Sequence, residues 1–210
     1  MSIQVPFALE LTGVAVFAVS GALTAARKQM DPLGFALLAT VAGVGGGTLR
    51  DVMLGQPVFW IVDPSDPAMC VFVGLATFLI GLRFRPTSRG LARALVWADA
   101  AGLAIFAVSG AQKALLSGAH PVTAVVLGAM TATFGGVVRD ILAGERPLIL
   151  HREIYVTAAA LGSGAFVLAV WLGLPPLAAA AAGVGSAFLL RALAILRDWS
   201  LPAFPGGAQG

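Results

Sequence analysis

The chain has 210 residues, of which 59% are hydrophobic and only 11% are charged, and its net charge is +3. A soluble domain carries about 25% charged residues, so this composition excludes a disordered chain and argues against a water-soluble globule. With a mean hydropathy of +0.93, it predicts an all-α polytopic membrane protein.

Seven apolar stretches are long enough, or nearly so, to cross a bilayer as helices. They cover about residues 5–26, 32–54, 67–82, 94–116, 121–143, 154–172 and 176–196. Proline, whose missing N–H does no harm in the first turn of a helix, stands at the start of five of them: Pro6, Pro32, Pro67, Pro121 and Pro176. We expect residues 199–210, which are rich in Pro and Gly, to form a disordered tail.

Basic residues gather in the loops on one side of these stretches. That side holds Arg27, Lys28, Arg83, Arg85, Arg89, Arg93, Arg146, Arg152, Arg191 and Arg197. The other side has no Lys or Arg clearly in a loop, and its loop at residues 56–66 contains Asp63 and Asp66. The positive-inside rule therefore predicts a cytoplasmic C-terminus and an outside N-terminus, and it accounts for the net positive charge without a nucleic-acid partner.

The two halves of the chain repeat each other at a constant shift of 89 residues. The block Phe17–Ala22 (FAVSGA) recurs as Phe106–Ala111. The same shift carries Gly46–Gly55 onto Gly135–Gly144, with the glycine pair, the Arg-Asp pair and the last glycine retained. Scattered matches in Ala- and Gly-rich sequence do not produce two such blocks at one shift, so we interpret them as an internal repeat.

Each copy of the repeat contains three apolar stretches. The first copy covers residues 1–90, the second covers 91–175, and the seventh stretch, at 176–198, lies outside the repeat. Because three is odd, the second copy enters the membrane from the opposite face, which predicts an inverted three-helix repeat plus one extra helix. Proteins of this kind place a permeation path or a substrate site between the copies, near the midplane.

Glycines interrupt the second and fifth stretches at equivalent points. They are Gly45, Gly46 and Gly47 in the first copy and Gly135 and Gly136 in the second. A glycine destabilises a helix interior by about 1 kcal/mol, and several together allow a kink or a break. We favour bent helices whose freed carbonyls line an aqueous path, and close packing of helices through small residues is the alternative.

An Arg-Asp pair follows the glycines by about one turn in each copy. The pairs are Arg50-Asp51 and Arg139-Asp140. A charge at the centre of a lipid-facing helix costs at least ~2.5 kcal/mol, so these side chains must face protein, water or lipid head groups. Two hypotheses remain open: charged groups at the two mouths of a path, or a structural ion pair in each copy.

Three further charges lie in or near the membrane. Glu10 and Asp99 occupy equivalent places in the two copies, where they either pair with Arg139 and Arg50 across the pseudo-axis or bind cations. Lys113 has no basic counterpart in the first copy. It either lines the path or extends to the membrane interface.

Hydroxyl side chains stand beside the repeated blocks. Ser20 and Ser109 belong to the FAVSGA blocks, and Thr48 and Thr133 flank the glycines. Hydroxyl and carbonyl oxygens can replace part of the hydration shell of a cation, which makes these residues candidates for the permeation path. The alternative for each is a hydrogen bond to its own helix backbone.

Motifs of enzymes and metal sites are absent from the sequence. The two histidines, His120 and His151, have no partner at metal-ligand spacing, and the single Cys70 excludes an intramolecular disulfide. No phosphate-binding or dinucleotide-binding fingerprint occurs. The sequence therefore predicts neither an enzyme nor a bound cofactor or metal.

The repeated FAVSGA and glycine/Arg-Asp blocks resemble the bacterial members of the trimeric intracellular cation (TRIC) channel family, whose two-copy domain is also labelled a glycine transporter domain. The resemblance covers the first six stretches and implies seven spans, a homotrimer and one potassium-permeable pore within each subunit. In that family the pore runs between the halves, and the second and fifth helices bend at glycines that correspond to Gly45–Gly47 and Gly135–Gly136 here. Animal members bind a phosphoinositide through a basic motif in the fourth helix, of which only Lys113 has a match, so phosphoinositide binding is not expected.

The sequence and the resemblance together predict a passive monovalent-cation channel in the inner membrane of a bacterium, with potassium as the permeant ion. Since the chain has no TVGYG filter, we expect modest selectivity of potassium over sodium. The main alternative is a secondary transporter of a small solute such as glycine, because inverted repeats are common in transporters. A structural protein whose glycines only pack is the third hypothesis.

Overall fold

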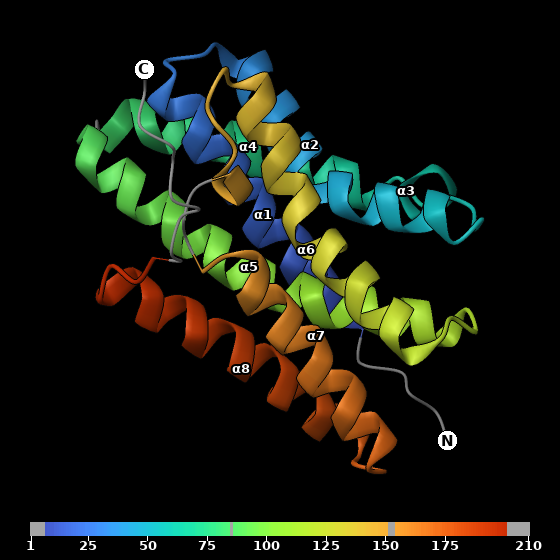
Figure 1. Cartoon of the computed structure of the whole chain (residues 1–210). Coiled ribbons are helices and arrows are strands. Elements are labelled where there is room, and N and C mark those ends of the chain that lie inside the picture. Colours follow the sequence, from blue (N-terminus) through green and yellow to red (C-terminus); the bar gives the residue numbers. More distant parts are fainter. Residues whose placement is uncertain (1–6, 85, 151–153, 201–210) are drawn as a thin grey trace, which may run out of the picture.

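The computed structural model describes residues 7–84, 86–150 and 154–200, and it is built from α-helices (Figure 1). The helices are α1 (Phe7–Arg27), α2 (Pro32–Met53), α3 (Phe59–Val62), α4 (Ser65–Phe84), α5 (Ser88–Leu116), α6 (Pro121–Leu142), α7 (Val156–Trp171) and α8 (Pro176–Leu196), with a 3-10 turn, η1, at Leu148–Leu150. The predicted all-α membrane fold is confirmed. Of the expected disordered tail, residues 201–210 lie outside the described residues.

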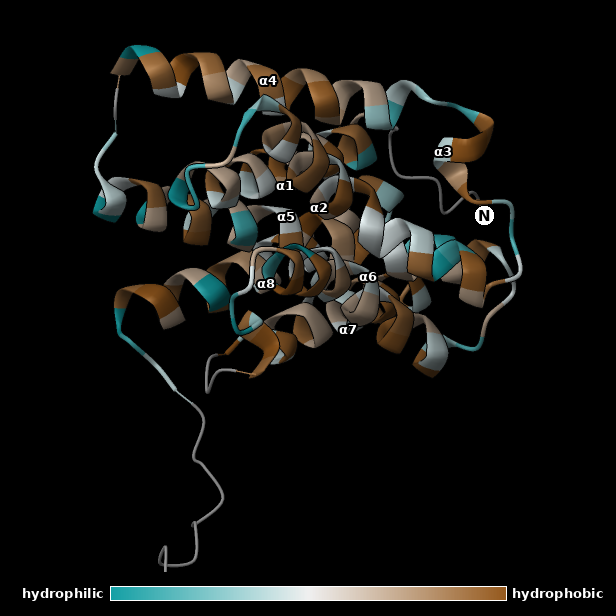
Figure 2. Cartoon of the chain, turned by 90° about the horizontal axis from the view of Figure 1, so that it is seen from above, coloured by the Kyte–Doolittle hydropathy of each residue, from teal (hydrophilic) through white to brown (hydrophobic). Residues whose placement is uncertain are grey.

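Six of these helices are long and apolar enough to cross a bilayer, namely α1, α2, α4, α5, α6 and α8. Figure 2 shows hydrophobic residues along most of α4, with hydrophilic ones near its end. The apolar helix α7 has only 16 residues, which at 1.5 Å per residue gives a length of about 24 Å, against about 30 Å of hydrocarbon. The described residues thus contain six full-length candidate spans and a shorter seventh helix.

The start of α5 differs from the sequence prediction. The helix begins at Ser88, before the apolar stretch, because the hydroxyl of Thr87 accepts a hydrogen bond from the Gly90 N–H at 3.2 Å and caps the first turn. Arg89 and Arg93, which were expected in a loop, therefore lie on the helix. The short elements α3 and η1 were not predicted either.

The contact between α1 and α5 reveals how the two copies are related. A Cβ atom added to Gly13 would lie 2.8 Å from the Phe106 ring, and one added to Gly102 would lie 2.6 Å from the Phe17 ring. Positions 13 and 17 are equivalent to 102 and 106, so the contact is reciprocal, and the residue numbers rise in opposite directions along the two helices. The helices therefore run antiparallel, as an inverted repeat requires.

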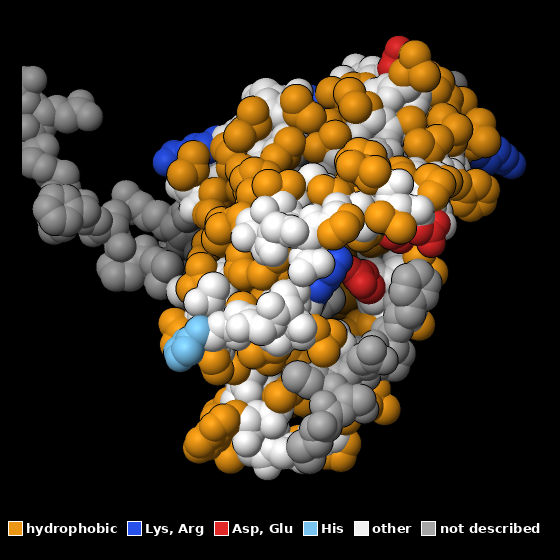
Figure 3. All heavy atoms as spheres, turned by 90° about the vertical axis from the view of Figure 1, so that its right-hand side faces the viewer, with side chains coloured by type: hydrophobic (Ala, Val, Ile, Leu, Met, Phe, Trp, Pro, Cys, Tyr) orange, Lys and Arg blue, Asp and Glu red, His pale blue; other side chains and the backbone are white. Residues whose placement is uncertain are grey.

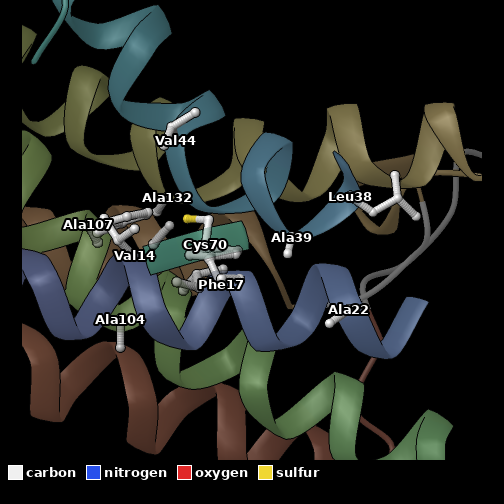
Figure 4. Close-up of a cluster of buried hydrophobic side chains, with 14 of the residues drawn as sticks. Val14, Phe17, Ala22, Leu38, Ala39, Val44, Cys70, Ala104, Ala107 and Ala132 are labelled. Carbon is white, nitrogen blue, oxygen red and sulfur yellow. The ribbon is translucent and has the colours of Figure 1, made fainter. Parts of the chain in front are cut away.

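Phe17 and Phe106 mark the axis of this relation. Their rings stack with centroids 5.1 Å apart and planes 18° from parallel. Because the two residues are equivalent positions of the repeat, their mutual contact lies on the pseudo-two-fold axis. Figure 4 shows Phe17 in the surrounding apolar core, with Val14 of the same helix and Cys70 of α4 close by. All three side chains are buried, so this part of the interface between the copies is filled by protein.

Candidate functional site

Charged and polar side chains form two clusters, one around the Arg-Asp pair of each copy of the repeat. The first, here named the α2 cluster, consists of Glu10, Arg50, Asp51 and Lys113. The second, the α6 cluster, consists of Ser20, Asp99, Arg139 and Asp140. The predicted charged residues are therefore brought together in two sets, each near the C-terminal end of a central helix.

The α2 cluster is partly open to the surface. Arg50 Nε donates to Asp51 Oδ1 at 2.8 Å, and Arg50 Nη1 donates to Glu10 Oε1 at 3.2 Å. Lys113 Nζ donates to the second oxygen of Asp51 at 3.0 Å. The Arg50 side chain is 1% exposed, whereas those of Glu10 and Lys113 are 34% and 32% exposed. Glu10 and Lys113, each about a third exposed, therefore lie between the buried Arg50-Asp51 pair and the protein surface.

The α6 cluster is closed. Arg139 Nε donates to Asp140 Oδ1 at 2.8 Å, and Arg139 Nη1 donates to Asp99 Oδ1 at 2.7 Å. Nη1 also donates to the hydroxyl of Ser20, which belongs to the other copy of the repeat. The side chains of Arg139 and Asp99 are fully buried and that of Asp140 is 6% exposed. Ions buried in this way are stable only when they are paired and hydrogen-bonded.

The second carboxylate oxygen of each aspartate holds a short helical element. Asp51 Oδ2 accepts the backbone N–H of Phe59 at 3.0 Å, at the start of α3. Asp140 Oδ2 accepts the backbone N–H of Leu148 at 3.2 Å, at the start of η1. Phe59 and Leu148 are related by the same shift of 89 residues, so the aspartate of each cluster accepts equivalent hydrogen bonds.

The acid partners of the arginines correct one of the sequence hypotheses. Pairing of Glu10 with Arg139 and of Asp99 with Arg50 across the pseudo-axis is wrong, because Glu10 binds Arg50 and Asp99 binds Arg139. The reason is packing: the first helix of each copy lies directly against the second helix of the same copy. Each of these ion pairs therefore joins the first and second helices of one copy.

The glycines serve close packing between α2 and α6. A Cβ atom added to Gly46 would overlap the carbonyl oxygen of Thr131, and one added to Gly135 would overlap that of Ala42. Both helices run through their glycines without interruption, so neither helix is broken there, and the bend expected at these glycines stays a prediction. Figure 1 shows α6 as one ribbon that changes direction along its length. Gly45 also lies in this contact, with Gly135 Cα 3.5 Å from its added Cβ atom.

The predicted hydroxyl residues have different surroundings. Only Ser20 contacts a charged cluster. Thr48 donates to the Val44 carbonyl at 2.7 Å and accepts from the indole of Trp60 at 2.8 Å, while Thr133 donates to the Ala129 carbonyl at 2.9 Å. The hydroxyl of Ser109 is buried without a hydrogen-bond partner among the described residues.

Two aromatic residues next to the clusters were missed by sequence reasoning. The ring of Phe59 lies 5.8 Å from the charged groups of both Arg50 and Lys113 and fills the space left by Gly47. Tyr155 is buried, and its hydroxyl would lie 2.9 Å from a Cβ atom added to Gly136. The only available signal was the repeat itself, which makes Phe59 the counterpart of Leu148 but assigns no role to either residue.

One face of the protein carries charged side chains surrounded by hydrophobic and neutral residues. Figure 3 shows a basic and an acidic side chain side by side in the middle of this face, among mostly hydrophobic and neutral groups. Within the ranges that the structure describes, no group of three or more His, Cys, Asp or Glu residues is placed to hold a metal ion. His151 lies outside those ranges. The charged clusters are therefore the strongest candidates for a functional site.

Comparison with known proteins gives consistent matches over most of the chain. The family model described as "Glycine transporter" matches twice, at residues 7–81 and 96–171, which correspond to the two copies of the repeat. The UPF0126 inner membrane protein YadS of Escherichia coli is 39% identical over 198 residues, covering 93% of this chain and 94% of the relative. The UPF0126 membrane protein YvgT of Bacillus subtilis is 38% identical over 169 residues, covering 79% and 80%.

Two solved structures are similar to this chain in both sequence and fold. The TRIC channel orthologue from Rhodobacter sphaeroides is 49% identical, with a TM-score of 0.86, and the match covers 91% of this chain and 97% of that one. A second TRIC cation channel is 36% identical, with a TM-score of 0.84, over 98% and 100% of the two chains.

Proposed function

The chain belongs to the trimeric intracellular cation (TRIC) channel family, and from this premise we propose that it is a passive channel for monovalent cations, chiefly potassium, in a bacterial inner membrane. In this proposal the active form is a homotrimer with one pore inside each protomer. The pore follows the interface between the two copies of the repeat, which we name the seam.

The observation that carries the proposal is the pair of charged clusters at the ends of α2 and α6. Because the two copies are inverted, the C-terminal ends of α2 and α6 approach opposite faces of the membrane, so one cluster lies toward each end of the seam. Keeping several charges inside a membrane protein costs free energy, and such residues commonly mark an ion path. The α6 cluster has two carboxylates for one arginine, which favours cations over anions.

The hydroxyls and the glycine carbonyls supply the weak sites that permeation needs. Neutral hydroxyl oxygens come from Ser20, Ser109, Thr48 and Thr133. Backbone carbonyls without side-chain cover come from the glycines, Gly45–Gly47 and Gly135–Gly136. In the present structure α2 and α6 touch at these glycines, so conduction requires the two helices to separate. We therefore assign the described conformation to a closed channel.

The membrane orientation in this proposal follows the basic residues. Arg27 and Lys28, at the end of α1, lie 3.3 and 3.4 Å from Glu145, which follows α6. The ends of α1 and α6 are therefore on the same side of the membrane. Both carry basic residues, and the positive-inside rule makes this side cytoplasmic.

Planar-bilayer recording tests the proposed function. Full-length protein in a bilayer with a potassium chloride gradient should give unitary currents that reverse near the potassium equilibrium potential. Replacing potassium by sodium on one side should shift the reversal potential by a modest amount, because the chain has no carbonyl-ring filter. Silent bilayers, with protein shown to be folded and trimeric by size-exclusion chromatography, would contradict the proposal.

Replacement of Lys113 by Met is expected to raise the unitary conductance about twofold at low salt. The substitution removes a partly exposed positive charge from one mouth of the path and frees an oxygen of Asp51, which raises the local cation concentration. The gain should fade at 1 M salt, where the Debye length falls to about 3 Å. A gain that is equal at both salt concentrations would indicate a steric effect.

Transport of a small solute such as glycine is the second candidate function. The description of the matching family model and the inverted repeat favour it. Uptake of labelled glycine into proteoliposomes that saturates with concentration and depends on an ion gradient would support this alternative. A flux that rises linearly with the potassium gradient and ignores glycine would support the channel.

A further inference from the structure

The hydroxyl of Ser109 is one of several buried polar groups near the seam that have no hydrogen-bond partner in the described part of the chain. Nη2 of Arg50 and Nη2 of Arg139 are two others. Arg50 is 2% exposed and Ser109 is 6% exposed, so neither group is well placed to be satisfied by bulk water. Unpartnered buried donors and acceptors are unfavourable, and each one in a native structure needs a physical explanation.

The repeat supplies that explanation. Arg50 and Ser109 are the counterparts of Arg139 and Ser20 at the shift of 89 residues, and Arg139 does donate to Ser20. Ser109 therefore lacks the arginine partner that its counterpart Ser20 has. Nη1 of Arg139 binds both Asp99 and Ser20, whereas Nη1 of Arg50 binds Glu10 and not Ser109. The related residues have the same chemistry in both places, so both bonds are chemically possible.

The formed bond differs in kind from the other contacts of the α6 cluster. The ion pairs to Asp99 and Asp140 stay within the second copy, whereas the bond from Arg139 to Ser20 crosses the seam from α6 to α1. A bond between Arg50 and Ser109 would cross the seam in the same way, from α2 to α5. At the α6 cluster the Arg139–Ser20 bond crosses the seam, whereas the α2 cluster is crossed by the ion pair between Asp51 of α2 and Lys113 of α5.

We propose that the chain carries two equivalent seam latches, Arg139–Ser20, which is engaged in this structure, and Arg50–Ser109, which is released here and engages in a second conformation. This inference rests on the proposed function, because it treats the seam as the ion path. Each latch closes one end of the seam. Conduction requires both latches to be released. In this structure the Arg139–Ser20 latch closes the α6 end, and at the α2 end the Asp51–Lys113 ion pair crosses the seam where the Arg50–Ser109 bond is not formed.

The differences between the clusters explain why the α2 latch is released. Lys113 occupies one oxygen of Asp51, and its counterpart Thr24 instead donates to the carbonyl of Ser20 in its own helix at 3.1 Å. Glu10 is one methylene longer than Asp99 and is a third exposed, whereas Asp99 is fully buried. Arg50 thus pairs with the partly solvated Glu10, and Lys113 is a second cation in its cluster. Arg139, in contrast, pairs with the buried Asp99.

Cysteine accessibility tests the latches without any current. In full-length protein with Cys70→Ala, single cysteines are placed at Leu54 and Ala143, equivalent residues that follow α2 and α6. Ser20→Ala should raise the rate of thiol modification at Ala143→Cys about tenfold, the factor expected for losing a hydrogen bond to a charged group, and leave Leu54→Cys unchanged. Ser109→Ala should raise the rate at Leu54→Cys at least about twofold and leave Ala143→Cys unchanged.

Ser109→Ala is the decisive variant. It removes no bond from the described conformation, so a protein without a second conformation gives parental rates at both cysteines, and that result would overturn the proposal. Ser186→Ala, whose hydroxyl bonds only a carbonyl of its own helix, is the matched control and should change neither rate. Because modification is measured without conduction, silent bilayers together with the expected rates would reject the channel function and leave the latches standing.

Discussion

Replacing Arg139 with Ala is expected to destabilise the protein by about 3–5 kcal/mol, because the substitution leaves two buried carboxylates without their positive partner. Asp99 and Asp140 are 0% and 6% exposed, and Arg139 forms the ion pair that each of them has in the structure. The loss should appear as a lower midpoint of thermal unfolding for the full-length protein in one detergent.

The equivalent substitution in the first copy is the matched control. Arg50→Ala should cost about 1–2 kcal/mol, since Lys113 still binds Asp51 and Glu10 is partly solvated. Adding Asp99→Asn to Arg139→Ala should recover part of the larger loss, because removing both charges of a buried pair is less harmful than removing one. Equal losses for the two arginine variants would contradict the contrast between an open and a closed cluster.

The fold could be predicted from the sequence because its main signals are local. Long apolar stretches with proline at their starts gave α2, α6 and α8 nearly to the residue. The repeat was predicted from one exact and one partly conserved block at the same shift, and its inversion from the odd number of helices in each copy. The start of α5 was missed because Ser88–Arg93 is polar, and a capping hydroxyl rather than hydrophobicity defines that end.

The sequence predicted which charged residues belong to the candidate site but not how they pair. The charged residues stood out because ions are rare in apolar stretches, but their partners depend on which helices touch. Pairing of Glu10 with Arg50 or with Arg139 is equally favourable by charge alone, and the packing of α1 on α2 decides between them. Phe59 and the short helix α3 were missed because the hydrogen bond that the Phe59 N–H donates to Asp51 positions them.

The role of the glycines shows the same limit. A run of small residues indicates either a weak point in a helix or a place where another backbone comes close. The sequence contains no information on which backbone that is. The structure identifies carbonyl oxygens of the opposite copy as the neighbours of Gly46 and Gly135, so packing is the role in the described conformation. Separation of α2 and α6 at these glycines in an open state is part of the proposed function.

The double variant Gly46→Ala with Gly135→Ala is expected to be less destabilising than the sum of its parts. Each single substitution places a methyl group against a backbone carbonyl that cannot rotate away, and such overpacking costs about 1–3 kcal/mol. Both glycines lie in one contact between α2 and α6. Once the first methyl group has pushed the helices apart, the second finds room, so a double-mutant cycle should give a coupling of about 1 kcal/mol.

The control for this cycle is Gly185→Ala on α8, where an added methyl group meets no other atom within 4 Å. That variant should be neutral or slightly stabilising, because Ala favours a helix more than Gly does. Unitary currents of the double variant then decide between two roles for the glycines. A conductance that changes with the forced separation would tie this contact to the path, whereas a destabilised protein with parental conductance would mean that the glycines only pack and that ions pass elsewhere.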